Sequence, residues 1–318
     1  MDKLSDAFAS ALFFRIVLPG LVFAIGVHPF LRALLYTQSV SSVYPADGTA
    51  LFIVEVVCFG LIAYAATSSV YYIATGATFP WLTKLSKLTN ETRFNGALAR
   101  YKALYANNQY KDMSEVQKEK VKKLSRYLRD FPILPNKDSI PDHVFQKPTR
   151  LGNIIATYEM YSNTRYRISS GDFWYHFLYC MPAEIRKELN SIEATAQGMV
   201  LSAAAGWLIL VILICAWVGR ALYGIQSFVV IGKSPVSDTL LLYLTVYATV
   251  VILVFNALAR VSHRDYGKNF CAAFDTNSQR FIEWLREHHA PVSSTVAQKG
   301  EIINLYLRYL IEGDQNQW

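Results

Sequence analysis

Four long apolar runs dominate the pattern of hydrophobic and polar positions along the chain. They extend over Ala11 to Leu35, Ala50 to Thr75, Gly198 to Tyr223 and Leu240 to Ala259. Each has about the 20 residues that a helix needs to cross a ~30 Å hydrocarbon core, and none shows the alternation of a barrel strand. Because only helices and closed barrels satisfy their backbone inside a bilayer, the runs predict an all-α membrane protein with four transmembrane helices.

Length and composition add a soluble part to this picture. The chain has 318 residues, of which 53% are hydrophobic, and a formal net charge of +7. We predict transmembrane helices 1 and 2 in residues 1–77 and transmembrane helices 3 and 4 in residues 198–260. A basic helical cytoplasmic domain is expected between helices 2 and 3, in residues 78–197, and a helical cytoplasmic tail in residues 261–318.

The positive charges predict the orientation. Residues 77–197 contain 19 basic and 12 acidic residues, and this difference of +7 equals the net charge of the whole chain. The loop 36–49 has no Lys or Arg, and the loop 224–238 has only Lys233. Because short loops rich in Lys and Arg stay in the cytoplasm, we expect a multi-pass protein of the bacterial inner membrane with both termini cytoplasmic.

Two ionisable residues inside the apolar runs lie at comparable depth. They are Arg32 in the first run and Glu55 in the second, and an ion pair between them would lower the cost of burying each charge. Such a pair either locks the two helices together, or Glu55 faces an aqueous path and attracts cations. In the second case Arg32 either partners Glu55 or reaches the membrane interface.

Small and polar residues mark faces of the last two runs. Gly198, Ser202 and Gly206 recur every four residues, which predicts close packing against another helix, either within the chain or between copies. Polar side chains on the fourth run either line a wet pore or hydrogen-bond a neighbouring helix. They are Tyr243, Tyr247 and Asn256.

The predicted cytoplasmic domain begins with two helices. Asn90 suits the cap of a helix that ends near Asn107, and Ser114 begins a second helix that continues to Asp130. The second helix is strongly basic, and its charge is either a solvated face or a contact for anionic lipid, nucleic acid or a nucleotide signal. Its candidate ligand-binding residues are Lys122, Lys123, Arg126 and Arg129.

The most distinctive local sequence opens with a Pro-Thr-Arg-Leu-Gly-Asn element at residues 148–153. Arginine forks suit carboxylate or phosphate, and tyrosine rings offer stacking faces, so this segment suits an anionic, nucleotide-like ligand. The candidate residues are Arg150, Arg165, Arg167, Tyr161 and Tyr166. In the alternative interpretation the tyrosines fill a core and the arginines pair with nearby carboxylates, which are Glu159, Asp172 and Glu184.

Long helices are expected to connect the two parts of the chain. The segment from Pro182 to Tyr223 has no further proline and no turn cluster, so a cytoplasmic helix is expected to continue into the third membrane helix. Such a rod would transmit a rotation from the domain to the membrane bundle. The tail is expected to form two short amphipathic helices, one on each side of Pro291.

The 148–153 element also carries a resemblance. Together with Tyr158, Tyr166 and Phe173-Trp174, it resembles a signature of a family of uncharacterised bacterial integral membrane proteins, over residues 148–186. The plan of several membrane helices around a basic helical domain is similar to membrane effectors of bacterial antiphage defence. The second resemblance implies a response to nucleotide or nucleic-acid signals by permeabilisation of the inner membrane, on architecture alone.

The sequence contains no nucleophile elbow, zinc-protease motif or phosphate-binding glycine loop, so we expect no enzyme and no cofactor. The leading hypothesis is a homo-oligomeric membrane effector or ion channel that an anionic cytoplasmic signal gates. The alternative is a non-conducting membrane anchor or scaffold for a soluble partner protein. Membrane lipids are expected partners in both cases.

Overall fold

A computed structural model describes residues 9–37, 48–76, 80–107, 113–134, 142–166, 174, 177–223 and 237–289. The regular structure of these residues is helical apart from two strands of two residues each, which agrees with the expected all-α fold. The predicted tail helix after Pro291 lies outside the described residues.

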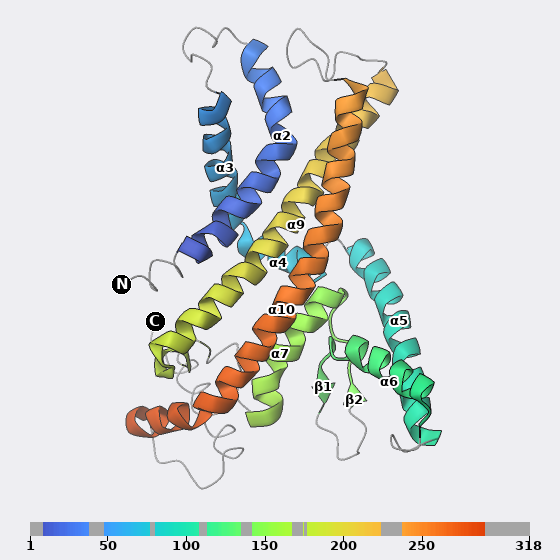
Figure 1. The fold of residues 1–318 in the computed structure, drawn as a ribbon, viewed down its shortest axis with the longest axis vertical. Coiled ribbons are helices and arrows are strands. Elements are labelled where there is room, and N and C mark those ends of the chain that lie inside the picture. The colour runs from blue at the N-terminus through green and yellow to red at the C-terminus, as the bar shows by residue number, and fades with distance from the viewer. Residues whose placement is uncertain are drawn as a thin grey trace, which may run out of the picture. The chain divides into compact units, whose positions relative to one another are not determined.

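The elements follow one another as shown in Figure 1. They are η1 (Phe13–Val17), α2 (Leu18–Thr37), α3 (Gly48–Ala65), α4 (Thr67–Ala74), α5 (Pro80–Asn107), α6 (Glu115–Leu128), β1 (Ile133–Leu134), β2 (Asp142–His143), α7 (Arg150–Tyr166), α9 (Ala183–Tyr223) and α10 (Asp238–His289). The two strands pair antiparallel, with Ile133 opposite His143 and Leu134 opposite Asp142.

Three helices are long and apolar enough to cross a membrane: Ala9–Leu31, Ala183–Ala221 and Asp238–Phe281. The second predicted run differs from a simple span, because it divides into α3 and α4, which meet at an angle of 65°. The chain is therefore a multi-pass membrane protein by the length and composition of its helices, with three spans, or four if the bent pair counts as one.

Two compact units divide the chain. Unit 1 comprises residues 1–71 and 190–262, and unit 2 comprises residues 72–189 and 263–318. The boundaries between the units fall inside α9 and α10. Each of these two helices continues without interruption through the boundary and contributes residues to both units. The helix that the sequence predicted from Pro182 onwards is thus present as α9, and the first predicted tail helix is part of the longer α10.

Unit 1 is a helical bundle in which backbones approach closely at glycines. A Cβ atom on Gly20 would lie 2.0 Å from the Val56 carbonyl oxygen of α3, and one on Gly60 would lie 2.2 Å from the Ile16 carbonyl oxygen of η1. Apolar side chains of α2, α9 and α10 fill the bundle, including the fully buried Leu213. Apolar side chains also cover its outside, as expected for helices solvated by lipid.

Unit 2 holds two apolar clusters. One joins α5 and α6 around Phe94, Leu128 and Phe131. The other is a series of aromatic rings from α7, from Trp174 and Phe177, and from α10, in which Phe177 stacks on Phe274 with ring centroids 4.0 Å apart. The two ring planes are nearly parallel, with an interplanar angle of 7°, and stacked aromatic pairs stabilise a core beyond their buried area.

Local sequence explains where α6 begins, whereas α5 begins earlier than expected. Ser114 caps α6 as predicted: its hydroxyl accepts from the Gln117 backbone, and the Gln117 side chain accepts from the Ser114 backbone. Asn90 was expected to cap a helix, which is wrong, because α5 already begins at Pro80. The Asn90 amide instead donates to the carbonyl oxygens of Ser86 and Pro148, at 2.9 and 2.8 Å.

We predict that Gly60→Ala destabilises the bundle, because the added methyl group would overlap the backbone of η1. The free energy of unfolding is expected to fall by about 1–3 kcal/mol, which thermal unfolding of the purified protein in detergent would detect. Gly96→Ala is the matched control, since a Cβ atom there meets nothing within 4 Å on helix α5. An equal loss at both positions would contradict the close approach at Gly60.

Candidate functional site

The 148–153 element forms the start of helix α7. The Thr149 hydroxyl accepts a hydrogen bond from the Gly152 backbone at 3.0 Å and donates to the Ala74 carbonyl oxygen at 2.8 Å. It therefore caps α7 and ties it to the end of α4. The Pro148 carbonyl oxygen accepts from Ser86 and Asn90 of α5, so the same turn also joins α5.

Asn153 satisfies the backbone that precedes α7. Its side chain is fully buried, and its Oδ1 accepts from the backbone N–H groups of Gln146 and Lys147 at 2.9 and 3.0 Å. Its Nδ2 donates to the carbonyl oxygens of Lys147 and Thr149 at 2.6 and 2.8 Å. The Thr149 carbonyl oxygen also accepts from the Asn153 backbone N–H at 3.1 Å, whereas the groups of Gln146 and Lys147 are satisfied by this buried amide, so Asn153 stabilises the irregular turn before α7.

Two glycines let this turn pack tightly. Gly76 has a φ of +98°, a left-handed conformation that suits glycine, and a Cβ there would lie 2.7 Å from the Pro148 ring. A Cβ on Gly152 would lie 2.8 Å from the Thr75 carbonyl oxygen. The element that looked like a ligand signature is thus accounted for largely by helix capping and close packing.

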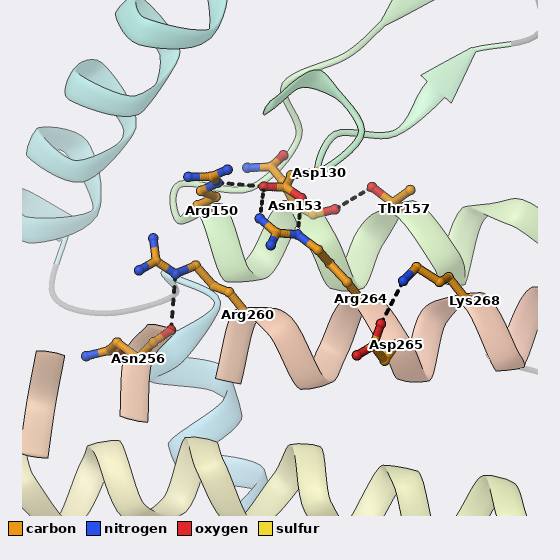
Figure 2. Close-up of polar contacts among 9 residues, drawn as sticks. All are labelled: Asp130, Arg150, Asn153, Thr157, Asn256, Arg260, Arg264, Asp265 and Lys268. Atoms are coloured by element: carbon orange, nitrogen blue, oxygen red, sulfur yellow. Dashed lines mark hydrogen bonds and ion pairs between the residues drawn. The ribbon is translucent and has the colours of Figure 1, made fainter. Parts of the chain in front are cut away.

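A buried carboxylate connects three helices of unit 2 (Figure 2). Asp130 follows α6 and is only 1% exposed. Arg150 of α7 donates through Nε to Oδ2 at 2.6 Å. Arg264 of α10 donates through Nε to Oδ1 at 2.5 Å and through Nη2 to Oδ2 at 2.7 Å. We call Asp130, Arg150 and Arg264 the arginine clasp.

The arginine clasp has an excess of positive charge. Two guanidinium groups face one carboxylate, and both reach solvent, since the side chains of Arg150 and Arg264 are 32% and 36% exposed. The Arg150 guanidinium also lies over the Tyr127 ring, 4.9 Å from its centroid. Burial raises the pKa of the Tyr127 hydroxyl, while the positive charges of Arg150 and Arg93 oppose that rise. Burial and the negative charge of Asp130 prevail, so the pKa of Tyr127 lies above its usual value.

The predicted basic residues of α6 are exposed. Lys122, Lys123, Arg126 and Arg129 all point to solvent, and we call these four residues the basic face. Lys123 makes a long ion pair with Glu119, at 3.8 Å, which is solvent-exposed and weak. An exposed face with this excess of cations suits a polyanionic partner.

The other predicted ligand residues are placed in different ways. The Tyr161 hydroxyl donates to the carboxylate of Asp275 on α10, at 2.7 and 2.8 Å from its two oxygens. Arg165 and Tyr166 end α7, but their side chains, like the whole of Arg167, lie outside the described residues. Arg150 therefore pairs with Asp130 rather than with Glu159, Asp172 or Glu184. Tyr161, which was to fill a core in the alternative interpretation, hydrogen-bonds Asp275.

Glu55 contacts a residue that the sequence analysis did not name as its partner. Its Oε2 lies 2.9 Å from Nδ1 of His28 on α2, and the side chain is 6% exposed. Its Oε1 is buried and has no hydrogen-bond partner within the described part of the chain. The side chain of Arg32 lies outside that part, so the pair of Arg32 with Glu55 stays a prediction.

The small and polar faces of α9 and α10 make contacts inside unit 1. Cβ atoms on Gly198 and Gly206 would collide with Phe14 and Val251, and Ser202 is fully buried. The Tyr247 hydroxyl donates to the Val22 carbonyl oxygen at 3.1 Å. Two further polar residues of α10 differ from one another: Tyr243 is 68% exposed, and the Asn256 amide donates to the Ile252 carbonyl oxygen of its own helix.

Sequence reasoning missed the residues that organise this site. The sequence places Asp130 at the end of a basic helix and assigns no role to Arg264. These two residues lie 134 positions apart, and no spacing rule connects them. The role of Asn153 could have been inferred from the sequence, because an asparagine near a helix start can bind local backbone groups.

Comparisons with known proteins add no family to this picture. A scan against models of protein families found no match, and neither did searches of curated proteins and of solved structures. The two resemblances suggested by the sequence therefore stay predictions. The site is interpreted from its residues and their geometry.

We predict that Asp130→Asn destabilises unit 2, because two arginines would lose the carboxylate that holds them. The free energy of unfolding should fall by about 2–4 kcal/mol in denaturant titrations of the full chain followed by circular dichroism. Asp265→Asn is the matched control, since it removes an exposed i,i+3 pair with Lys268 and should cost less than about 1 kcal/mol. Similar losses in both variants would show that Asp130 has no special structural role.

Proposed function

We propose that this protein is a homo-oligomeric effector or ion channel of the bacterial inner membrane that an anionic cytoplasmic signal gates. The observation that carries the proposal is the exposed basic face of α6, in a chain that also has three or four apolar spans. A nucleotide, an oligonucleotide or a nucleic acid would supply the negative charge. Permeabilisation of the membrane in antiphage defence is the role that the architecture resembles.

The topology of the proposal follows the charge asymmetry. The bent pair α3 and α4 would act as the second of four spans, which places both termini on one side of the membrane. Residues 78–197 would then form a cytoplasmic domain and residues 261–318 a cytoplasmic tail, because the basic residues cluster in the first of these segments.

An ion path would have to form between copies of the chain. Side chains fill the centre of the bundle in unit 1, so a single chain offers little room for an aqueous path. The exposed Tyr243 on α10 is a polar group on the outside of the bundle, where another copy could bring it to a wet interface. The filled bundle and the exposed Tyr243 both favour assembly into a homo-oligomer.

Coupling would use the two long helices. Because α9 and α10 contribute residues to both units without interruption, a change of packing in unit 2 can rotate or shift helices that also belong to the bundle. The activity proposed is binding and gating, and it involves no catalytic step and no cofactor.

A second candidate function is a non-conducting membrane anchor for a soluble partner protein. The close contacts at Gly20, Gly60 and Gly198 favour it, because a bundle packed backbone to backbone resists opening. In that case the basic face would bind an acidic surface of the partner.

We predict that purified protein in liposomes conducts ions when ATP or a short single-stranded oligonucleotide is added on the side of the basic face. Lys122→Glu combined with Arg126→Glu should raise the ligand concentration for half-maximal flux by about tenfold or more, because each lost contact with a charged ligand weakens binding. Stopped-flow dye quenching would measure the flux.

Lys84→Glu combined with Lys87→Glu on α5 is the control, since it changes the net charge equally at exposed positions away from the basic face. An unchanged response in this control supports a specific role of α6. If neither ligand produces flux in any orientation, the effector proposal fails, and a monomer by light scattering would then favour the anchor.

A further inference from the structure

We propose that Arg93, Tyr127, Arg150 and Arg264 form a seat for the phosphate group of a phosphorylated ligand, with the buried carboxylate of Asp130 holding two of the arginines in place. We call these four residues the phosphate seat. The inference rests on the proposed function, because it names where and by what chemistry the anionic signal would bind.

Asp130 binds only part of each guanidinium group in the arginine clasp. Asp130 uses Nε of Arg150 and the Nε and Nη2 edge of Arg264. The two terminal nitrogens of Arg150 and Nη1 of Arg264 have no partner among the residues that the structure describes. A carboxylate that holds one edge of a guanidinium leaves the other edge free to bind two oxygens of a ligand.

The phosphate seat carries a net positive charge. Within the arginine clasp one carboxylate faces two guanidinium groups, which leaves an excess of one positive charge. Arg93 of α5 is exposed, and its positive charge acts to lower the pKa of the Tyr127 hydroxyl against the effect of burial. The carboxylate of Asp265 also acts on Arg264, but it is itself paired with Lys268, so these groups together carry about the charge that balances a phosphate dianion.

Tyr127 lies next to the guanidinium group of Arg150. Its ring lies under the Arg150 guanidinium, 4.9 Å from ring centroid to Cζ, and its hydroxyl adds a donor to the phosphate seat. Lys123 lies four residues earlier on α6 and therefore on the same side of the helix. A ligand whose phosphate occupies the phosphate seat could thus extend further negative charge towards the basic face.

Two sources could supply the phosphate, namely a soluble nucleotide or the headgroup of an anionic lipid. The full chain is purified and reconstituted in nanodiscs of phosphatidylcholine. In one arm, isothermal titration calorimetry measures the binding of pyrophosphate. In the other arm, native mass spectrometry counts phosphatidic acid molecules that remain bound after the lipid is mixed into the nanodiscs. Saturable binding in the first arm indicates a soluble ligand, and retention in the second arm indicates a lipid.

The variants avoid the salt bridges that hold unit 2 together. Arg93→Gln removes a charge outside the arginine clasp, and Tyr127→Phe removes the hydroxyl but keeps the ring under Arg150. We expect Arg93→Gln to weaken binding by about tenfold and Tyr127→Phe by about threefold or more. Arg280→Gln is the matched control, because it removes an exposed arginine of α10 distant in sequence from Arg264, and binding should not change.

Two results would overturn the inference. In the first, neither pyrophosphate nor phosphatidic acid binds saturably to the wild type. In the second, the variants Arg93→Gln, Tyr127→Phe and Arg280→Gln all bind the ligand equally well. Its failure is distinct from that of the proposed function. Ligand-dependent flux that depends on Lys122 and Arg126, without any effect of Arg93→Gln, would retain the effector and reject the phosphate seat. Binding that depends on Arg93 without flux would retain the phosphate seat and reject the effector.

Discussion

A carboxylate removed from water must be paired, and much of unit 2 depends on how this chain pairs Asp130. The side chain is almost fully buried, and burial of an unpaired charge would cost several kcal/mol. Three hydrogen bonds from Arg150 and Arg264 compensate that cost. Because the donors come from α7 and α10, this one requirement determines which helices meet at the end of α6.

The neighbouring turn follows the same logic with neutral groups. The buried side chain of Asn153 binds four backbone groups of the irregular segment before α7, and Thr149 closes the first turn of α7 while it binds the end of α4. Polar side chains thus connect α4, α5, α7 and α10 where apolar packing alone would specify no unique register. Such a network also orients the guanidinium groups at its edge, so one arrangement can serve both stability and ligand binding.

The bundle of unit 1 relies on a different constraint. Between apolar helices in lipid, packing rather than the hydrophobic effect favours association, and glycine permits the closest packing. Gly20, Gly60 and Gly198 each bring one backbone against another. The pair of half-buried His28 with buried Glu55 adds a polar contact in this apolar setting, and it connects α2 to α3.

Hydropathy and local signals alone determined the helical class, the apolar spans, the start of α6 at Ser114 and the uninterrupted α9, because each depends on residues close together in sequence. The bend between α3 and α4, the early start of α5 and the partners of Glu55 and Arg150 were decided by the tertiary structure. Those features depend on which distant segments meet. Pairing between Asp130 and Arg264 spans 134 residues, and only the folded chain selects it from the many charge pairs that the composition allows.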